Sequence, residues 1–135
     1  MDLFKSMQIS ASAMQAQGER MRIVSENLAN ADSVSKEPGG DPYRRKMLTF
    51  RNELDRNLGA RVVKAGKPVP DKSDFTLSYD PAHPAADANG YVKRPNVRPI
   101  IELADMREAQ RSYEANLSAI DIAKSMVSRI IDLLR

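Results

Sequence analysis

The sequence contains no cysteine and no tryptophan, and aromatic residues make up only 5% of its 135 residues. Without cysteine there can be no disulfides, thiol catalysis or cysteine-ligated zinc, and the redox compartment stays open. No apolar run approaches the roughly 18 residues of a membrane span, and the N-terminus lacks the basic-then-apolar pattern of a signal peptide. We therefore expect a protein that does not span a membrane and that, if it leaves the cytoplasm, uses another route.

Proline is absent from both ends of the chain, because all eight prolines fall between Pro38 and Pro99. Each end carries apolar residues at alternating spacings of three and four, which places them on one stripe of a helix. A spacing that averages about 3.5 residues keeps that stripe facing a partner helix, as in a coiled coil. The sequence predicts a mainly α fold in which helices over residues 1–31 and 96–135 pair as an antiparallel coiled coil, with a small β-containing irregular middle region at 32–95.

The stripe residues are predicted to pack between the two helices and between subunits, since one narrow stripe gains little in water by itself. A second row, at Ala109, Asn116, Ala123 and Ile130, offers another face. The predicted packing residues are Leu3, Met7, Met14, Met21, Val24, Leu28, Leu103, Met106, Tyr113, Leu117, Ile120, Val127, Ile131 and Leu134.

The middle region is predicted to form a loop at residues 31–41 and short strands at 61–64 and 75–79. Asn89 and Gly90 give a strong turn signal before another apolar pair. We expect two to four strands in total. The second helix is predicted to begin at Asn96 as an N-cap, with Pro99 in the first turn.

The net charge of +3 comes from the middle region. Residues 38–99 hold 12 basic and 7 acidic residues, against 4 and 5 before them and 5 and 6 after them. The densest cluster is Arg44, Arg45 and Lys46, which could meet an anionic partner such as nucleic acid or a cell-wall polymer, or form a solvated surface. Because the chain lacks stacking aromatics and a basic recognition helix, we expect no nucleic-acid binding.

The residues offer little catalytic chemistry. Asp87, Asn89 and Gly90 imitate part of a calcium loop, but its first and last ligand positions are not filled by acids. His83 is the only histidine and lies between two prolines, which suits a rigid turn better than a base or a ligand. Asp80 and Asp87 are expected to cap or orient that turn. We therefore predict that the protein is not an enzyme and binds no cofactor or metal.

Three segments resemble bacterial flagellar rod and hook proteins. They are Ser25–Asp32 with the following Asp41–Lys46, Tyr79–Val97, and Met106–Leu117. The second segment is similar to the proximal rod members of that family. The motif residues are Asn27, Leu28, Ala29, Asn30, Tyr43, Asp80, Pro81, Gly90, Tyr91, Asn96, Val97, Arg111, Tyr113 and Asn116.

This resemblance implies a structural subunit of the proximal rod of the flagellar basal body. Such a subunit would assemble helically through its terminal helices into a periplasmic drive shaft that transmits motor torque. It would be exported by the flagellar type III system without a cleaved signal peptide. Its partners would be itself, other rod proteins and the junction of the MS ring with the export gate, with peptidoglycan nearby. The alternatives are a coiled-coil adaptor or export chaperone, and a nucleic-acid module.

Overall fold

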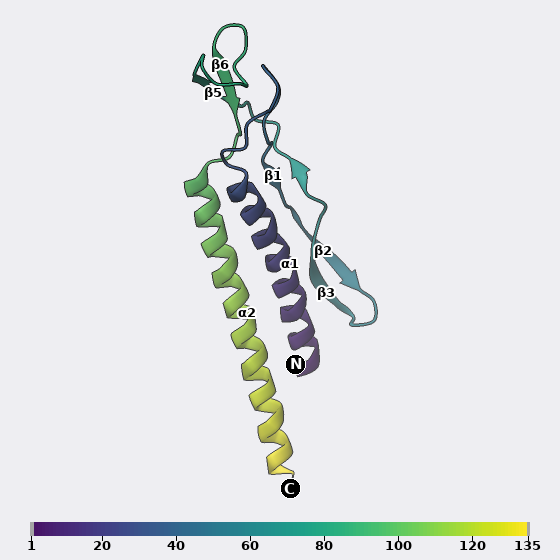
Figure 1. Cartoon of the computed structure of the whole chain (residues 1–135). Coiled ribbons are helices and arrows are strands. Elements are labelled where there is room, and N and C mark those ends of the chain that lie inside the picture. The colour runs from purple at the N-terminus through teal and green to yellow at the C-terminus, as the bar shows by residue number, and fades with distance from the viewer. Residues whose placement is uncertain (1, 135) are drawn as a thin grey trace. The chain divides into compact units, whose positions relative to one another are not determined.

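The computed structural model describes residues 2–134, so Met1 and Arg135, the outermost residues of the two predicted helical ranges, lie outside the described residues. Along these described residues, a first helix is followed by six strands and then by a second helix (Figure 1). The chain divides into two compact units. Unit 1 holds the chain up to Met21, Thr49–Lys67 and the chain from Met106. Unit 2 holds Arg22–Leu48 and Pro68–Asp105.

Both proline-free ends are helical, as predicted. Helix α1 is Leu3–Ala29 and helix α2 is Pro99–Leu133. Pro99 opens α2, where its missing N–H would have no helical acceptor. The predicted start at Asn96 is wrong. The carbonyl of Arg98 accepts the first helical bonds from Ile101 and Glu102, at 3.0 and 3.1 Å, while Asn96 bonds elsewhere.

The strands form three separate two-stranded antiparallel sheets. Strand β1 (Lys46–Met47) pairs with β4 (Val69–Pro70), β2 (Phe50–Asp55) with β3 (Ala60–Ala65), and β5 (Thr76–Tyr79) with β6 (Tyr91–Arg94). The strands expected at 61–64 and 75–79 are confirmed within a few residues. The expected total of two to four strands is wrong, since residues 2–134 form six. Strands β1, β2 and β4 were not predicted because their residues lack a clear apolar alternation.

Unit 1 is built on small side chains. Ala16 of α1 and Ala109 and Ala123 of α2 are 2%, 0% and 5% exposed, which lets neighbouring backbones approach closely. An ion pair of 3.6 Å joins Arg20 of α1 to Glu108 of α2. The β2–β3 hairpin turns at Gly59, whose φ of 61° favours glycine.

Unit 2 contains the β5–β6 hairpin, whose turn is held by Asp87. Its Oδ1 accepts hydrogen bonds from the backbone N–H groups of Asn89 and Tyr91, both at 2.9 Å. This confirms the predicted orienting role of Asp87. Gly90 has a φ of 81°, which favours glycine, and a Cβ there would also crowd the Tyr79 ring at 3.0 Å. His83 Nδ1 accepts a hydrogen bond of 3.1 Å from the Ala85 N–H, a turn-stabilising contact of the kind predicted.

Candidate functional site

Five polar side chains from separate parts of unit 2 meet in one network, which we call the polar junction: Asn27, Tyr43, Arg45, Asn96 and Glu102. Asn27 lies near the end of α1, Glu102 lies in the first turn of α2, and the others come from the segments between them. Asn27 and Glu102 are each only 1% exposed. Polar groups buried to this degree are stable only when their hydrogen-bonding capacity is used.

Asn27 uses all four hydrogen-bonding positions of its amide. Its Nδ2 donates to the Lys46 carbonyl at 2.8 Å and to Glu102 Oε2 at 3.1 Å. Its Oδ1 accepts from the Tyr43 hydroxyl and from the Lys46 N–H, both at 2.9 Å. An amide offers two donors and two acceptor sites, so Asn27 is fully satisfied. It thereby fixes the β1 segment and the start of α2 to the end of α1.

Glu102 is neutralised by Arg45. The guanidinium Nε donates to Glu102 Oε1 at 2.5 Å, and its other nitrogens lie 3.4 Å from Asp71 Oδ2 and 3.7 Å from Asp105 Oδ2. Burial acts to lower the pKa of Arg45, but the hydrogen bond and charge of Glu102, supported by Asp71, outweigh it and raise that pKa. The guanidinium therefore stays charged at every accessible pH.

Asn96 closes the network on the other side. Its Oδ1 accepts from the Arg45 N–H at 2.8 Å, and its Nδ2 donates to Ser73 Oγ at 2.9 Å. In the same loop the N–H of Asp71 donates to the Arg45 carbonyl at 2.8 Å. The backbone N–H of Ser73 lowers the pKa of Asp71, opposed by burial and helped by the Ser73 and Arg45 side chains. The junction thus holds the 71–73 loop in place.

The basic cluster that was expected to face solvent or an anion has partners within the chain. The guanidinium of Arg44 lies 4.1 Å from the centre of the Phe75 ring and donates to the Asp71 carbonyl at 2.8 Å. Lys46 forms an ion pair with Glu26, whose hydrogen bond raises the pKa of Lys46. Together with Arg45 in the junction, all three cations have partners within unit 2, and Arg45 and Lys46 are paired with acids.

The other motif residues do not join the junction. Asp80, Pro81, Gly90 and Tyr91 belong to the β5–β6 hairpin and its turn. Arg111, Tyr113 and Asn116 lie along α2, where Asn116 Nδ2 donates to the Ser112 carbonyl one turn back at 2.8 Å. Asn30 Nδ2 likewise donates to the Glu26 carbonyl at 2.8 Å. The motif therefore divides between a packed junction, a tight hairpin and a helix surface.

Burial along α2 follows one row at heptad spacing. Glu102, Ala109 and Ala123 are 1%, 0% and 5% exposed. Three members of the predicted stripe on the neighbouring row, Leu103, Ile131 and Leu134, are 48%, 55% and 83% exposed. Four other members of the same stripe, Met106, Tyr113, Ile120 and Val127, are half-buried. Within the chain, α2 is therefore covered fully along its small side chains and only in part along the predicted stripe.

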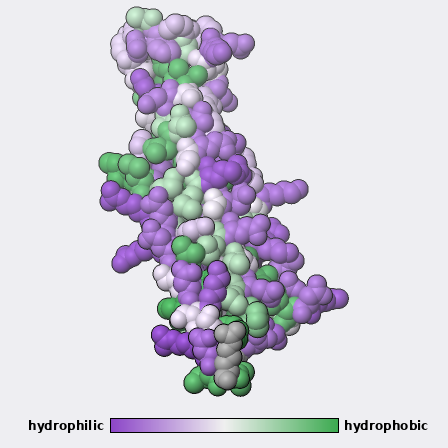
Figure 2. All heavy atoms as spheres, turned by 60° about the horizontal axis from the view of Figure 1, so that its bottom comes forward, coloured by the Kyte–Doolittle hydropathy of each residue, from purple (hydrophilic) through white to green (hydrophobic). Residues whose placement is uncertain are grey.

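Large apolar side chains are exposed at the start of α2 and again from Leu117 onward, although a helix of this composition would bury them if it had cover. Figure 2 shows apolar surface among hydrophilic side chains at the end of unit 1 that carries the chain termini. The exposed apolar residues of α2 are Ile100, Ile101, Leu103, Leu117, Ile122, Met126, Ile130, Ile131 and Leu133, between 42% and 86% exposed.

Sequence reasoning missed two parts of this arrangement. The first is the ion pair of Arg45 with Glu102. The sequence did carry a signal for this ion pair. Glu102 shares a heptad position with Ala109 and Ala123, and an acid buried in such a row needs a cation as its partner. The second is the row of Ile122, Met126 and Leu133, which recurs at helical spacing on a different side of α2 from Ala109 and Ala123. A helix with apolar rows on two sides is suited to pack on both.

The described residues contain no group of three or more histidine, cysteine, aspartate or glutamate side chains that could hold a metal ion. In the same part of the chain, neither helix combines the length and apolarity that a membrane crossing requires. What the arrangement offers is a fixed junction and an uncovered apolar helix surface, which is the chemistry of protein–protein packing.

Known proteins match the chain at both ends and over its length. The family described as flagella basal body rod protein matches residues 7–35, and the family described as flagellar basal body rod FlgEFG protein C-terminal matches residues 88–133. The flagellar basal-body rod protein FlgC of Agrobacterium fabrum is 54% identical over 127 residues, covering 94% of this chain and 91% of the relative.

More distant relatives cover the chain as fully. The flagellar basal-body rod protein FlgC of Bacillus subtilis is 40% identical, covering 98% of this chain and 99% of the relative. That of Salmonella typhimurium is 38% identical, covering 98% of each. Identity at this level across nearly the whole length shows common descent, and it agrees with the resemblance carried by the motifs. The chain therefore belongs to the FlgC family of flagellar basal-body rod proteins.

Proposed function

We propose that this structural rod subunit assembles helically through the exposed apolar rows of α2, and that the assembly transmits motor torque. Membership of the family makes the chain a structural protein of the flagellar basal body and not an enzyme. The observation that carries the finer proposal is the exposure of large apolar side chains along a 35-residue helix. Covering a fully exposed side chain of this kind stabilises by about 1.5–3 kcal/mol, and covering one already half-buried stabilises by less.

Within one subunit, α1 and α2 pair as an antiparallel coiled coil in this proposal. Two contacts support it: Asn27 bonds to Glu102, and Arg20, earlier in α1, pairs with Glu108, later in α2. Matching the outer ends of the two apolar stripes, Leu3 with Leu134, predicts Val24 opposite Tyr113. These contacts favour a register about one heptad away from that prediction. The predicted packing residues on α1 are all buried or half-buried, as this pairing requires.

The family resemblance supports a more specific setting. We place the subunit in the periplasmic proximal rod, after export by the flagellar type III system. Its neighbours would be further copies, other rod proteins and the junction of the MS ring with the export gate at the rod base. Proximity to peptidoglycan follows from that position.

The test is a charge in the exposed apolar rows. Leu117→Asp and Met126→Asp should abolish incorporation into purified basal bodies and swimming in soft agar, because an unpaired charge at a buried interface costs several kcal/mol. Ser125→Asp, at an exposed polar position beside Met126, is the matched control and should assemble. Circular dichroism of the purified variants checks that folding is unchanged. Normal rods with Leu117→Asp and Met126→Asp would refute assembly through these rows.

A further inference from the structure

The cover over α2 ends before the helix does. The buried row of Glu102, Ala109 and Ala123 continues at the next heptad position with Ile130, which is 50% exposed. Figure 1 shows the reason within unit 1, where α2 runs past the end of α1 that carries the N-terminus. We call residues 126–133 the α2 overhang. Its apolar row continues an interface that exists inside the chain, but among residues 2–134 nothing covers Ile130 in the way that Ala123 is covered.

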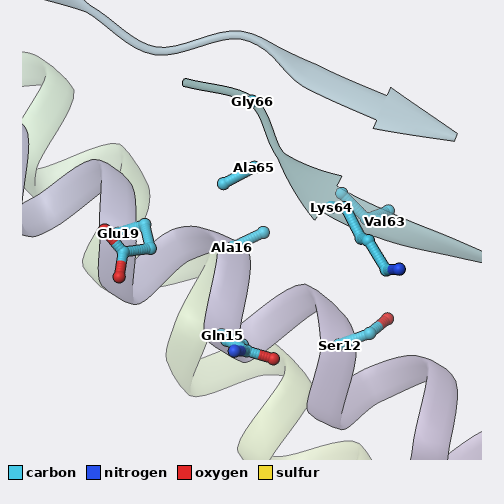
Figure 3. Close-up of a pocket in the computed structure, with 8 residues that line it drawn as sticks. All are labelled: Ser12, Gln15, Ala16, Glu19, Val63, Lys64, Ala65 and Gly66. Atoms are coloured by element: carbon cyan, nitrogen blue, oxygen red, sulfur yellow. The ribbon is translucent and has the colours of Figure 1, made fainter. Parts of the chain in front are cut away.

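A groove of about 330 Å³ lies elsewhere in unit 1, between α1 and β3. Figure 3 shows Ser12, Gln15 and Ala16 of α1 on one side and Ala65 and Gly66, at and after the end of β3, on the other. A second hollow of about 320 Å³ extends it along α1 to Gln8 and shares Ser12, Gln15, Val63 and Lys64 with the first. Ser12, Ala16, Ala65 and Gly66 give the first hollow a floor of small side chains, over which the side chains of a partner helix can approach.

The groove is long enough for the side chains of the overhang. From Gln8 to Glu19 the groove follows α1 for about 17 Å, and the overhang is about 12 Å long at a rise of about 1.5 Å per residue. Phe4, which is 65% exposed, lies on the same face of α1 as Gln8 and Ala11 because it precedes them by four and seven residues. An exposed aromatic ring beside a groove is a typical anchor for a partner.

We propose that the α2 overhang of one copy docks into the α1–β3 groove of a second copy of this chain. The inference rests on the proposed function and names the surfaces that meet. Inside one chain the buried row of α2 packs against α1. The groove lies on another face of α1, so the continuation of that row in a second copy would meet the same helix from a different side. Because the two surfaces differ, the contact is heterologous and repeats without closing, which generates a helical rod.

Cross-linking between two differently tagged copies in one cell tests this directly. The chain has no cysteine, so only introduced thiols react. Copies carrying Gln15→Cys and Ile130→Cys should give a mixed dimer with a short bis-maleimide in isolated basal bodies. Gln15→Cys with Arg107→Cys is the control, because Arg107 is exposed on α2 but lies outside the overhang. Equal yields from the two pairs would overturn the proposal.

Blocking the groove gives a second measurement. Gln15→Trp fills the groove from an exposed position, and it should abolish cross-linking between Ala11→Cys and Ile130→Cys together with swimming. Gln15→Ala leaves the groove open and should preserve both. Undiminished cross-linking with Gln15→Trp would contradict the docking. If Leu117→Asp and Met126→Asp prevent assembly but the Gln15 and Ile130 thiols do not join, the docking proposal fails while the proposed function stands.

Discussion

The polar junction and the outer half of α2 place their side chains in opposite ways. The junction buries an amide and a carboxylate, Asn27 and Glu102, at 1% exposure each. The outer half of α2 exposes apolar side chains such as Ile122 at 57% and Leu133 at 86%. The polar groups of Asn27 form all their hydrogen bonds within the chain. The apolar side chains of the outer half of α2 stay exposed in a single chain.

The difference separates what one subunit provides from what the assembly provides. Every polar group of Asn27 has a partner within unit 2, so the junction needs nothing from outside to be stable. The apolar rows of α2 gain free energy only when something covers them. We therefore expect substitutions in the junction to lower the stability of the isolated chain, and substitutions in the rows to affect assembly alone. Four predictions test this division, from the largest effect on stability to the smallest.

Removing the buried carboxylate should have the largest effect. Glu102→Ala leaves the half-buried Arg45 without its shortest ion pair and leaves Asn27 Nδ2 without one acceptor. We expect a loss of about 3–5 kcal/mol in the free energy of unfolding, measured by urea denaturation of the isolated chain. Glu108→Ala is the matched control, because Glu108 pairs with Arg20 on the surface with 71% of its side chain exposed. Its loss should stay below about 1 kcal/mol, and equal losses would contradict the distinction.

Asn27→Ala should have the next largest effect. It leaves the Tyr43 hydroxyl and the N–H and carbonyl of Lys46 without their hydrogen-bond partner. An unsatisfied buried polar group costs about 1–3 kcal/mol. Water entering the space should limit the total to about 2–3 kcal/mol. The control is Asn30→Ala, since Asn30 donates only to its own helix and accepts from Ser33. A thermal melt in which both variants lose the same stability would show that the network around Asn27 adds nothing.

Acid should weaken the junction through Asp71. Its pKa is lowered in the folded state, first by the backbone N–H of Ser73, from an ordinary value of 3.8. The native state therefore favours the ionised carboxylate. This contribution to stability is complete above the ordinary pKa and is lost as the pH falls through the lowered one.

Comparing wild type with Asp71→Asn isolates that contribution. Urea midpoints at neutral pH should favour the wild type. The gap between the two proteins should shrink as the pH falls below about 4, because protonated aspartate no longer differs in charge from asparagine. Glu102→Ala, by comparison, should be less stable than wild type at neutral pH by a wider margin. A gap that is independent of pH would exclude a role for the Asp71 charge.

The sequence predicts the parts of this molecule that depend on local spacing. Proline distribution and apolar periodicity give α1 and α2, and Asn89 with Gly90 gives the β5–β6 turn, because these signals act within a few residues. The start of α2 is mispredicted since Asn96, a good cap by type, bonds instead to Arg45 and Ser73, both distant in the chain. The burial of Glu102 likewise depends on Arg45, 57 residues away.

The interior face of α2 could not be read from apolar size. A rule that assigns the largest apolar side chains to the core selects Leu103 and Leu117, whereas the chain itself covers Ala109 and Ala123. Small residues allow close packing within the subunit, and large ones suit contacts between subunits, where a partner supplies the cover. Helix α2 carries both the small residues for packing within the subunit and the large residues for contacts between subunits. Apolar periodicity alone does not distinguish the two kinds of row.

The smallest effect on stability is predicted for Ile122→Asp, and it tests the division most sharply because the neighbouring residue supplies the control. Ile122 is 57% exposed and Ala123 is 5% exposed. In the isolated chain Ile122→Asp should change the free energy of unfolding by no more than about 0.5 kcal/mol, as surface substitutions do. Ala123→Asp should cost about 3 kcal/mol or more, because it buries an unpaired charge. In cells, however, both variants should fail to build rods, the first through a lost contact between subunits and the second through misfolding. Urea denaturation beside basal-body purification separates these causes. If Ile122→Asp destabilises the isolated chain as strongly as Ala123→Asp does, then the outer row is already covered within one subunit, and the contrast between junction and helix surface does not hold.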